Sequence, residues 1–167
     1  MKRRVPVLAM AGAATGLALA LAGCATPARD AARDSAPHWS GRLALQVEGQ
    51  PGQSFTAGFD LRGSAGQGEL ELFTPLGASA ALLQWAPGQA SLRTLGQPAR
   101  TAASLDDLVT QATGTSIPLA ALFDWLVGVP TAVAGWQADL SQHAAGRLRA
   151  RRLSTPTADL RILLEAP

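Results

Sequence analysis

The fold is decided by the stretch WSGRLALQVEGQPGQSFTAGFDL, residues 39–61. In residues 43–47 and again in 55–61, every second residue is apolar, and the residues between them are polar or small. This period of two is typical of a β-strand with one buried face. Gly49, Pro51 and Gly52 lie between the two runs and supply a turn. The stretch therefore predicts two antiparallel strands joined as a hairpin.

The same alternation recurs on the C-terminal side of this pair. It predicts strands at 68–73, 78–85 and 90–95, an edge strand at 98–102 that tolerates Pro98, and further strands at 136–140, 147–153 and 160–165. No internal repeat is present in the sequence.

Helical periodicity appears only in the middle of the chain. Ser104 is suited to cap a helix whose first turn contains Asp106 and Asp107, and Gly114 is suited to end it. A second helix is predicted over 118–127, with Pro118 at its first position and Gly128 at its C-terminal cap.

The order of strands, two short helices and strands indicates a mainly β (α+β) domain. We expect an antiparallel sheet curled around the helices, which cover its concave face. The pattern does not decide whether such a sheet closes into a barrel.

The N-terminus has the features of an export signal. Lys2, Arg3 and Arg4 precede an apolar run at 5–21, which ends in Leu21-Ala22-Gly23-Cys24. The run is shorter than the roughly 20 residues that span a bilayer, so a retained transmembrane anchor is the less favoured alternative.

Leu21-Ala22-Gly23-Cys24 resembles a bacterial lipobox. The resemblance implies cleavage before Cys24 and covalent lipid on its thiol, which also gives a use to the only cysteine in the chain. Ala25 stands where an aspartate would imply retention at the inner membrane, so the implied address is the outer membrane. The predicted organisation is a signal peptide at 1–23, an acylated flexible tether at 24–38 and one domain at 39–167.

Charge and motif content argue against nucleic-acid binding and catalysis. After residue 23 the chain keeps 11 arginines and 12 acidic residues, so its basic character belongs to the signal. The only histidines, His38 and His143, have no nucleophile or metal-ligand partner at a recognisable spacing. We therefore expect a binding protein rather than an enzyme, with a lipid-modified hydrolase as the remote alternative.

Several segments, taken in order, resemble the LolB family of outer-membrane lipoproteins. They are the lipobox, Trp39-Ser40-Gly41-Arg42-Leu43-Ala44, residues 72–78 (LFTPLGA), residues 117–119 (IPL) and residues 125–130 (WLVGVP). The family receives lipoproteins from the periplasmic carrier LolA and inserts them into the outer membrane. After Gly135-Trp136 the chain is short for the family, which implies that one or more terminal strands are reduced or absent.

The resemblance implies an open antiparallel half-barrel with helices covering an apolar cavity. It also implies a membrane-insertion loop of Pro75, Leu76 and Gly77, in which Pro75 and Gly77 direct Leu76 toward solvent. The implied partners are LolA, cargo lipoproteins and outer-membrane phospholipid, on the periplasmic face. The protein is expected to be a monomer, with no cofactor besides the lipid on Cys24.

Acyl chains need apolar surface, so large apolar residues are the candidates for the cavity or the core beneath it. These candidates are Leu43, Leu45, Phe55, Phe59, Leu70, Leu72, Leu82, Trp85, Leu119, Leu122, Phe123, Trp125 and Leu126. Trp125 lies off the apolar stripe of its helix, which favours a place at the rim of the cavity.

An arginine cluster at 147–152 gives a second surface of interest. Arg147, Arg149 and Arg151 share one face of the predicted strand. A solvated strand face is the simplest interpretation, and contact with an acidic carrier or with anionic lipid is the alternative. The rival to the transport function is a structural or assembly lipoprotein of the outer membrane that binds a protein partner.

Overall fold

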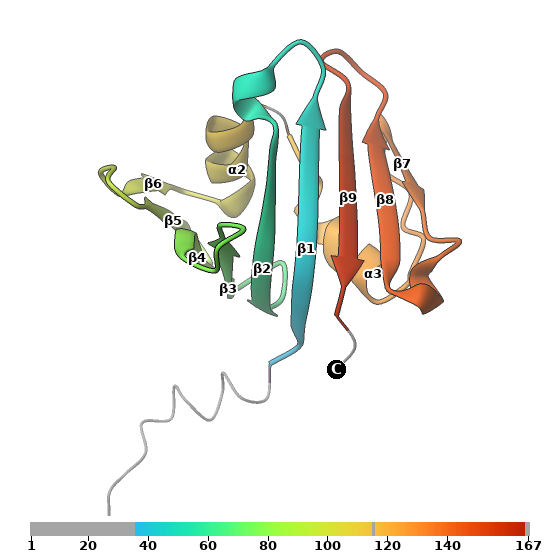
Figure 1. Ribbon diagram of the computed structural model, residues 1–167, viewed down its shortest axis with the longest axis horizontal. Helices are drawn as coiled ribbons and strands as arrows, with labels where there is room; N and C mark the ends of the chain where they lie inside the picture. The colour runs from blue at the N-terminus through green and yellow to red at the C-terminus, as the bar shows by residue number, and fades with distance from the viewer. Residues whose placement is uncertain (1–35, 115, 166–167) are drawn as a thin grey trace, which may run out of the picture.

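The structure, a computed structural model, describes residues 36–114 and 116–165. Its strands form one antiparallel sheet in the order β6-β5-β4-β3-β2-β1-β9-β8-β7 (Figure 1). The strands are β1 (His38–Val47), β2 (Phe55–Gly63), β3 (Gly68–Phe73), β4 (Ser79–Ala86), β5 (Gln89–Thr94), β6 (Arg100–Ala102), β7 (Trp136–Asp139), β8 (Arg147–Arg152) and β9 (Ala158–Leu164). Two short 3-10 turns, η1 (Pro51–Gln53) and η2 (His143–Ala145), complete the connections.

Strand β1 is an interior strand of this sheet and pairs with β2 on one side and with β9 on the other. Leu43 is opposite Ala57 of β2 and Ile162 of β9, and Leu45 is opposite Phe55 and Leu160. The predicted hairpin of residues 39–61 is therefore confirmed, and the C-terminal strand β9 joins it directly. The chain from Trp136 onward supplies three strands of the sheet, and the last of them, β9, pairs with β1 from Gly41 to Val47.

The helices α2 (Leu105–Thr113) and α3 (Leu119–Leu126) connect the two edges of the sheet, from β6 to β7. The Ser104 hydroxyl oxygen accepts a hydrogen bond from the Asp107 backbone N–H at 3.1 Å, and Gly114 ends α2 in the left-handed conformation. Both caps of α2 were predicted. Helix α3 is one residue shorter at each end than predicted, with Pro118 and Val127 as its caps.

Both helices lie on the inner face of the curved sheet; in the view of Figure 1, α2 is beside β2 and above β6, and α3 is behind β9 and β8. The edge strands β6 and β7 do not pair with each other, so the sheet is open. The expected open half-barrel with helices on its concave side is thus confirmed. Within the described residues, no helix has the length and apolar content needed to cross a bilayer.

The core lies between the helices and the sheet. Trp125 is its largest fully buried side chain, and the indole N–H donates a hydrogen bond to the Thr131 backbone carbonyl at 2.9 Å. The expectation of a rim position for Trp125 is therefore wrong. The chain after α3 folds back over the helix and brings Trp136 to 6.5 Å from Trp125 between ring centroids, so α3 is buried on a second side.

Gly41 allows β1 and β9 to approach closely. Its φ of +151° is rare for residues with a side chain, and a Cβ atom there would lie 2.0 Å from the Leu163 carbonyl oxygen. We expect Gly41→Ala to lower the free energy of unfolding by more than about 2 kcal/mol, because backbone must move to relieve the clash. Urea denaturation measures this loss.

Gly58 of β2 is the matched control. A Cβ atom there would meet the Phe73 Cβ at 3.5 Å, an ordinary contact. Gly58→Ala should change the free energy of unfolding by less than about 1 kcal/mol. Equal stability losses for the two variants would contradict this account of the β1–β9 pairing.

Candidate functional site

An apolar cavity of about 350 Å³ lies between the sheet and the helices. Strands β1 to β5 and β9 form its floor, and α2, Ile117 and α3 cover it. It is within the size range of small-ligand sites, which begins near about 300 Å³. Its lining residues are Leu43, Leu45, Phe55, Leu70, Leu72, Ala81, Leu83, Leu92, Thr94, Gln97, Arg100, Val109, Ala112, Thr113, Ile117, Leu119, Leu122, Leu160 and Ile162.

Seven of the predicted cavity candidates line this space. They are Leu43, Leu45, Phe55, Leu70, Leu72, Leu119 and Leu122. Their alternation on β1 and β3 and their spacing on α3 place them on the inner face, as the period of each element requires.

The other candidates lie elsewhere. Phe59, Trp85, Trp125 and Leu126 are buried in the core, and Phe123 packs against Trp39 with ring centroids 5.8 Å apart. Leu82 is on the outer face of β4, because its neighbours Ala81 and Leu83 line the cavity and strand residues alternate. Counting Leu82 as a cavity residue was therefore wrong.

Sequence reasoning did not select several lining residues. Leu160 and Ile162 are alternate residues of the predicted strand 160–165, but only the pairing of β9 with β1 brings them to the cavity. Ile117 belonged to a quoted motif, and its buried position above the sheet depends on the turn between the helices. Leu83 and Leu92 alternate correctly and could have been found by following the inner face across β4 and β5.

Polar and exposed residues mark one side of the cavity as its mouth. Thr94, Gln97 and Arg100, from the end of β5 to the start of β6, contribute to the lining, and both Gln97 and Arg100 are exposed. Phe55 is 38% exposed and also lines the cavity. An apolar ligand entering here would pass a polar lip before it meets leucine side chains.

Leu76 lies at the tip of the β3–β4 turn and is 97% exposed. The Gly77 N–H donates to the Thr74 carbonyl at 2.9 Å, and the Thr74 N–H donates to the Ala78 carbonyl at 2.8 Å. The Thr74 hydroxyl oxygen accepts a further bond from the Ala78 N–H at 3.2 Å. Pro75 and Gly77, with a φ of +82°, thus hold a tight turn that points its leucine into solvent.

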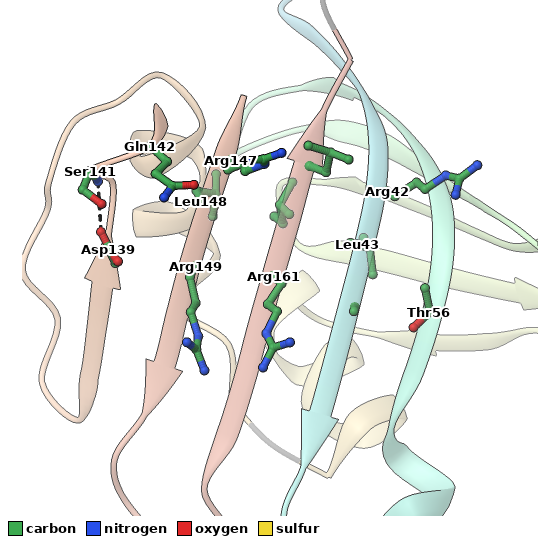
Figure 2. A pocket seen from close by; sticks show the side chains of 13 residues that line it. Arg42, Leu43, Thr56, Asp139, Ser141, Gln142, Arg147, Leu148, Arg149 and Arg161 are labelled. Carbon is green, nitrogen blue, oxygen red and sulfur yellow. Dashed lines mark hydrogen bonds between the residues drawn. The ribbon is translucent and has the colours of Figure 1, made fainter. Parts of the chain in front are cut away.

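A second hollow, of about 580 Å³, lies on the outer face of the sheet over β2, β1, β9 and β8 (Figure 2). Arg42, Arg147, Arg149 and Arg161 line it. Figure 2 shows Arg149 and Arg161 extending side by side from neighbouring strands. It is shallow and rich in arginine, so the inner cavity is the better site for an apolar ligand.

Asp159 neutralises part of this arginine face. It forms ion pairs with Arg149 and, at 2.7 Å, with Arg161, and Arg151 is 3.7 Å away. Burial alone would raise the pKa of Asp159, but hydrogen bonds from Arg149 and Arg161, together with their charges, hold it below its ordinary value. Arg42 and Arg147 are opposite Leu163 on either side, and neither forms an ion pair with a described residue.

The two histidines lie in separate places. The His38 ring nitrogen Nε2 is 2.8 Å from a carboxylate oxygen of Asp60 on an exposed surface. His143 Nε2 is 3.0 Å from the Leu126 carbonyl oxygen, so this side chain ties η2 to the end of α3. In residues 36–114 and 116–165, no three His, Cys, Asp or Glu side chains are grouped to hold a metal ion. Cys24 lies outside the described residues.

The chain therefore folds as an open half-barrel with an apolar cavity and an exposed leucine turn. A family model described as outer membrane lipoprotein LolB matches residues 37–159. The outer-membrane lipoprotein LolB of Thiobacillus denitrificans is 33% identical over 188 aligned positions, covering 98% of this chain and 96% of the relative. This protein belongs to the LolB family of outer-membrane lipoproteins.

Other relatives match over a smaller share of this chain. The outer-membrane lipoproteins LolB of Bordetella petrii and Ralstonia nicotianae are 34% and 36% identical, over 69% and 70% of this chain. The matched part spans 60% of the length of each of these two relatives.

A larger side chain at Ala81 should reduce the cavity without unfolding the protein. Ala81 is half-buried and lines the cavity, so Ala81→Phe fills space that no described side chain occupies. We expect a fluorescently labelled palmitate to bind about tenfold more weakly, a cost of about 1.4 kcal/mol. Fluorescence titration measures this affinity. Leu82→Phe, one residue along on the outer face, is the control and should bind as the parent does.

Asp159 should contribute to stability only while it is ionised. Its folded-state pKa is lowered, so its contribution is present above the ordinary pKa and is lost as pH falls through the folded value. Asp159→Asn should cost about 1 kcal/mol at neutral pH. In urea titrations the difference from the parent should shrink below about pH 4. A difference that persists unchanged in acid would contradict the role of these ion pairs.

Proposed function

We propose that this protein is an outer-membrane lipoprotein receptor, which accepts lipoproteins from the periplasmic carrier LolA and inserts them into the outer membrane. The observation that supports this most is the helix-covered apolar cavity, which opens at a polar lip. Membership of the LolB family supports the same function.

Transfer of an acyl chain makes and breaks no covalent bond. Each methylene that leaves an apolar site for water costs about 0.8 kcal/mol, so a chain can move only if a second apolar site replaces the first. Leu43, Leu70, Leu122 and their neighbours would provide that second site. The reaction is an exchange of one burial for another, so we propose no catalytic residue and no turnover chemistry.

Leu76 would act in the second step, in which the cargo passes from the cavity into the membrane. An exposed leucine on a tight turn keeps its apolar side chain in water, which is unfavourable. Insertion into the interfacial region of a bilayer would bury that side chain. Burying one leucine contributes about 1.5–3 kcal/mol, which is enough for contact and too little for permanent attachment. The turn would therefore touch the membrane briefly and let the cargo chains pass into it.

Permanent attachment would come from lipid on Cys24, at the periplasmic face of the outer membrane. Two or more acyl chains anchor a protein stably, whereas one binds marginally. The segment 24–38 would serve as a tether, and about a dozen extended residues reach tens of ångströms. Anchorage then fixes location, while the cavity and the Leu76 turn perform the transfer. We propose that the protein does this as a monomer with no cofactor other than that lipid.

A structural or assembly lipoprotein is the alternative function, and the arginine face of Figure 2 favours it, because Arg42 and Arg147 are available to an acidic protein surface. Gentle purification of the protein with a substituted Cys24 separates the two functions. A receptor should carry lipid in its cavity, whereas a purely structural protein should carry none.

The decisive variant for the receptor function is Leu76→Glu. A carboxylate at the turn tip opposes entry into the bilayer, so cargo insertion should fall at least about tenfold, while the exposed position leaves the fold intact. The measurement follows a labelled lipoprotein from LolA to liposomes bearing this protein. Leu76→Met is the matched control and should retain insertion. Full insertion by Leu76→Glu, with an unchanged near-ultraviolet circular dichroism spectrum, would remove the loop from the mechanism.

A further inference from the structure

A second exposed leucine lies on the β5–β6 turn. Leu95 is 83% exposed. The Gln97 N–H donates to the Thr94 carbonyl at 3.1 Å, and Gly96 has a φ of +73°, so residues 94–97 form a tight turn with Leu95 at its first central position. Because Leu95 is held at the tip, its exposure is built into the backbone.

This turn and the Leu76 turn lie at the same end of the sheet. In an antiparallel series, the β3–β4 and β5–β6 connections are on one side and the β4–β5 connection is on the other. Thr94 pairs with Ala81, and the Leu95 N–H is 3.4 Å from the Ala80 carbonyl oxygen. Two strand spacings, about 10 Å, separate such neighbouring turns. One flat surface could therefore touch both leucines.

The charge of this part of the sheet fits an anionic surface. Between Glu71 and Asp106 the sequence contains no acidic residue, and its only charged side chains are Arg93 and Arg100. Both arginines are exposed, and they lie just before and just after the Leu95 turn. Exposed leucines beside arginines match a bilayer, whose interior takes the apolar groups and whose phosphates attract the cations.

The cavity mouth is continuous with the same turn. Thr94, Gln97 and Arg100 belong to the turn or follow it and also line the cavity. On the neighbouring strands, Leu72 and Ala81 line the cavity close to the base of the Leu76 turn. Leu76 and Leu95 thus lie on two turns that flank the same part of the cavity mouth.

We propose that Leu95 is a second membrane contact, which acts together with Leu76 to hold the cavity mouth against the phospholipid surface. This inference rests on the proposed function, because it takes the Leu76 contact with the membrane as given. Leu95 would then orient the protein on the membrane surface. One contact leaves the protein free to tilt about a point. Two contacts on neighbouring turns restrict that tilt and shorten the path of the cargo from the mouth to the bilayer.

The test places an environment-sensitive fluorophore at single cysteines in the full-length lipidated protein, whose own Cys24 thiol is blocked by lipid if the lipobox is processed. Leu95→Cys, Leu76→Cys and Val129→Cys are labelled in turn. Val129 is an exposed apolar residue beyond the end of α3, and it is the matched control. The anchored proteins are placed in vesicles of phosphatidylethanolamine and phosphatidylglycerol that contain acyl-brominated lipid, which quenches only fluorophores that enter the bilayer.

We expect quenching at positions 95 and 76 and none at 129. Quenching at 76 without quenching at 95 would overturn this inference and leave the proposed function standing. The absence of quenching at both 76 and 95 would contradict the Leu76 contact as well. Equal quenching at all three positions would mean that the surface lies on the bilayer without preferred orientation, which also overturns the inference.

A functional measurement checks the same point without a probe. With Leu76 intact, Leu95→Glu should slow the insertion of cargo into liposomes about tenfold and leave uptake from LolA unchanged. Val129→Glu should affect neither step. If Leu95→Glu inserts cargo at the rate of the parent, Leu95 is not a membrane contact that matters for insertion, and the inference is overturned.

Discussion

The pairing of β1 with both β2 and β9 is the constraint on which the other features depend. It places Leu43 and Leu45 opposite Ile162 and Leu160, so residues far apart in the chain form one apolar floor. Gly41 permits this pairing, because only a residue without a side chain leaves room for the Leu163 carbonyl oxygen. Without β9 beside β1, the floor would lose Leu160 and Ile162, and the cavity would open to water along that side.

The cavity is incompletely filled by the protein itself, and this has a physical consequence. The small side chains of Ala81 and Ala112 leave space that larger side chains would occupy in an ordinary core. The same helices that bury Trp125 and Leu108 completely leave Leu119 and Leu122 half-buried above the floor. The helices are thus fully packed on one side and leave space for a ligand on the other. That combination suits the proposed transfer, in which the site takes an acyl chain and gives it up again.

Local chemistry made much of this architecture predictable. The hairpin of residues 39–61, the Ser104 and Gly114 caps and the outward Arg147, Arg149 and Arg151 follow from periods and caps that depend on near neighbours alone. The Thr74–Gly77 turn likewise carries its geometry in Pro75 and Gly77. Trp125 shows the limit, because its burial depends on the returning segment that brings Trp136 against it. Alternation separates Leu82 from its neighbours Ala81 and Leu83, but alternation alone does not decide which face of β4 points inward.

The proposed function requires that acyl chains of cargo lipoproteins occupy the cavity between the sheet and the helices. The most direct measurement uses a lipoprotein with a photoactivatable group near the end of one acyl chain, loaded on LolA and mixed with this protein. Mass spectrometry then locates the crosslinks. We expect crosslinks to cavity-lining residues such as Leu43, Leu83 and Leu122. Crosslinks confined to the outer arginine face, with none in the cavity, would contradict it.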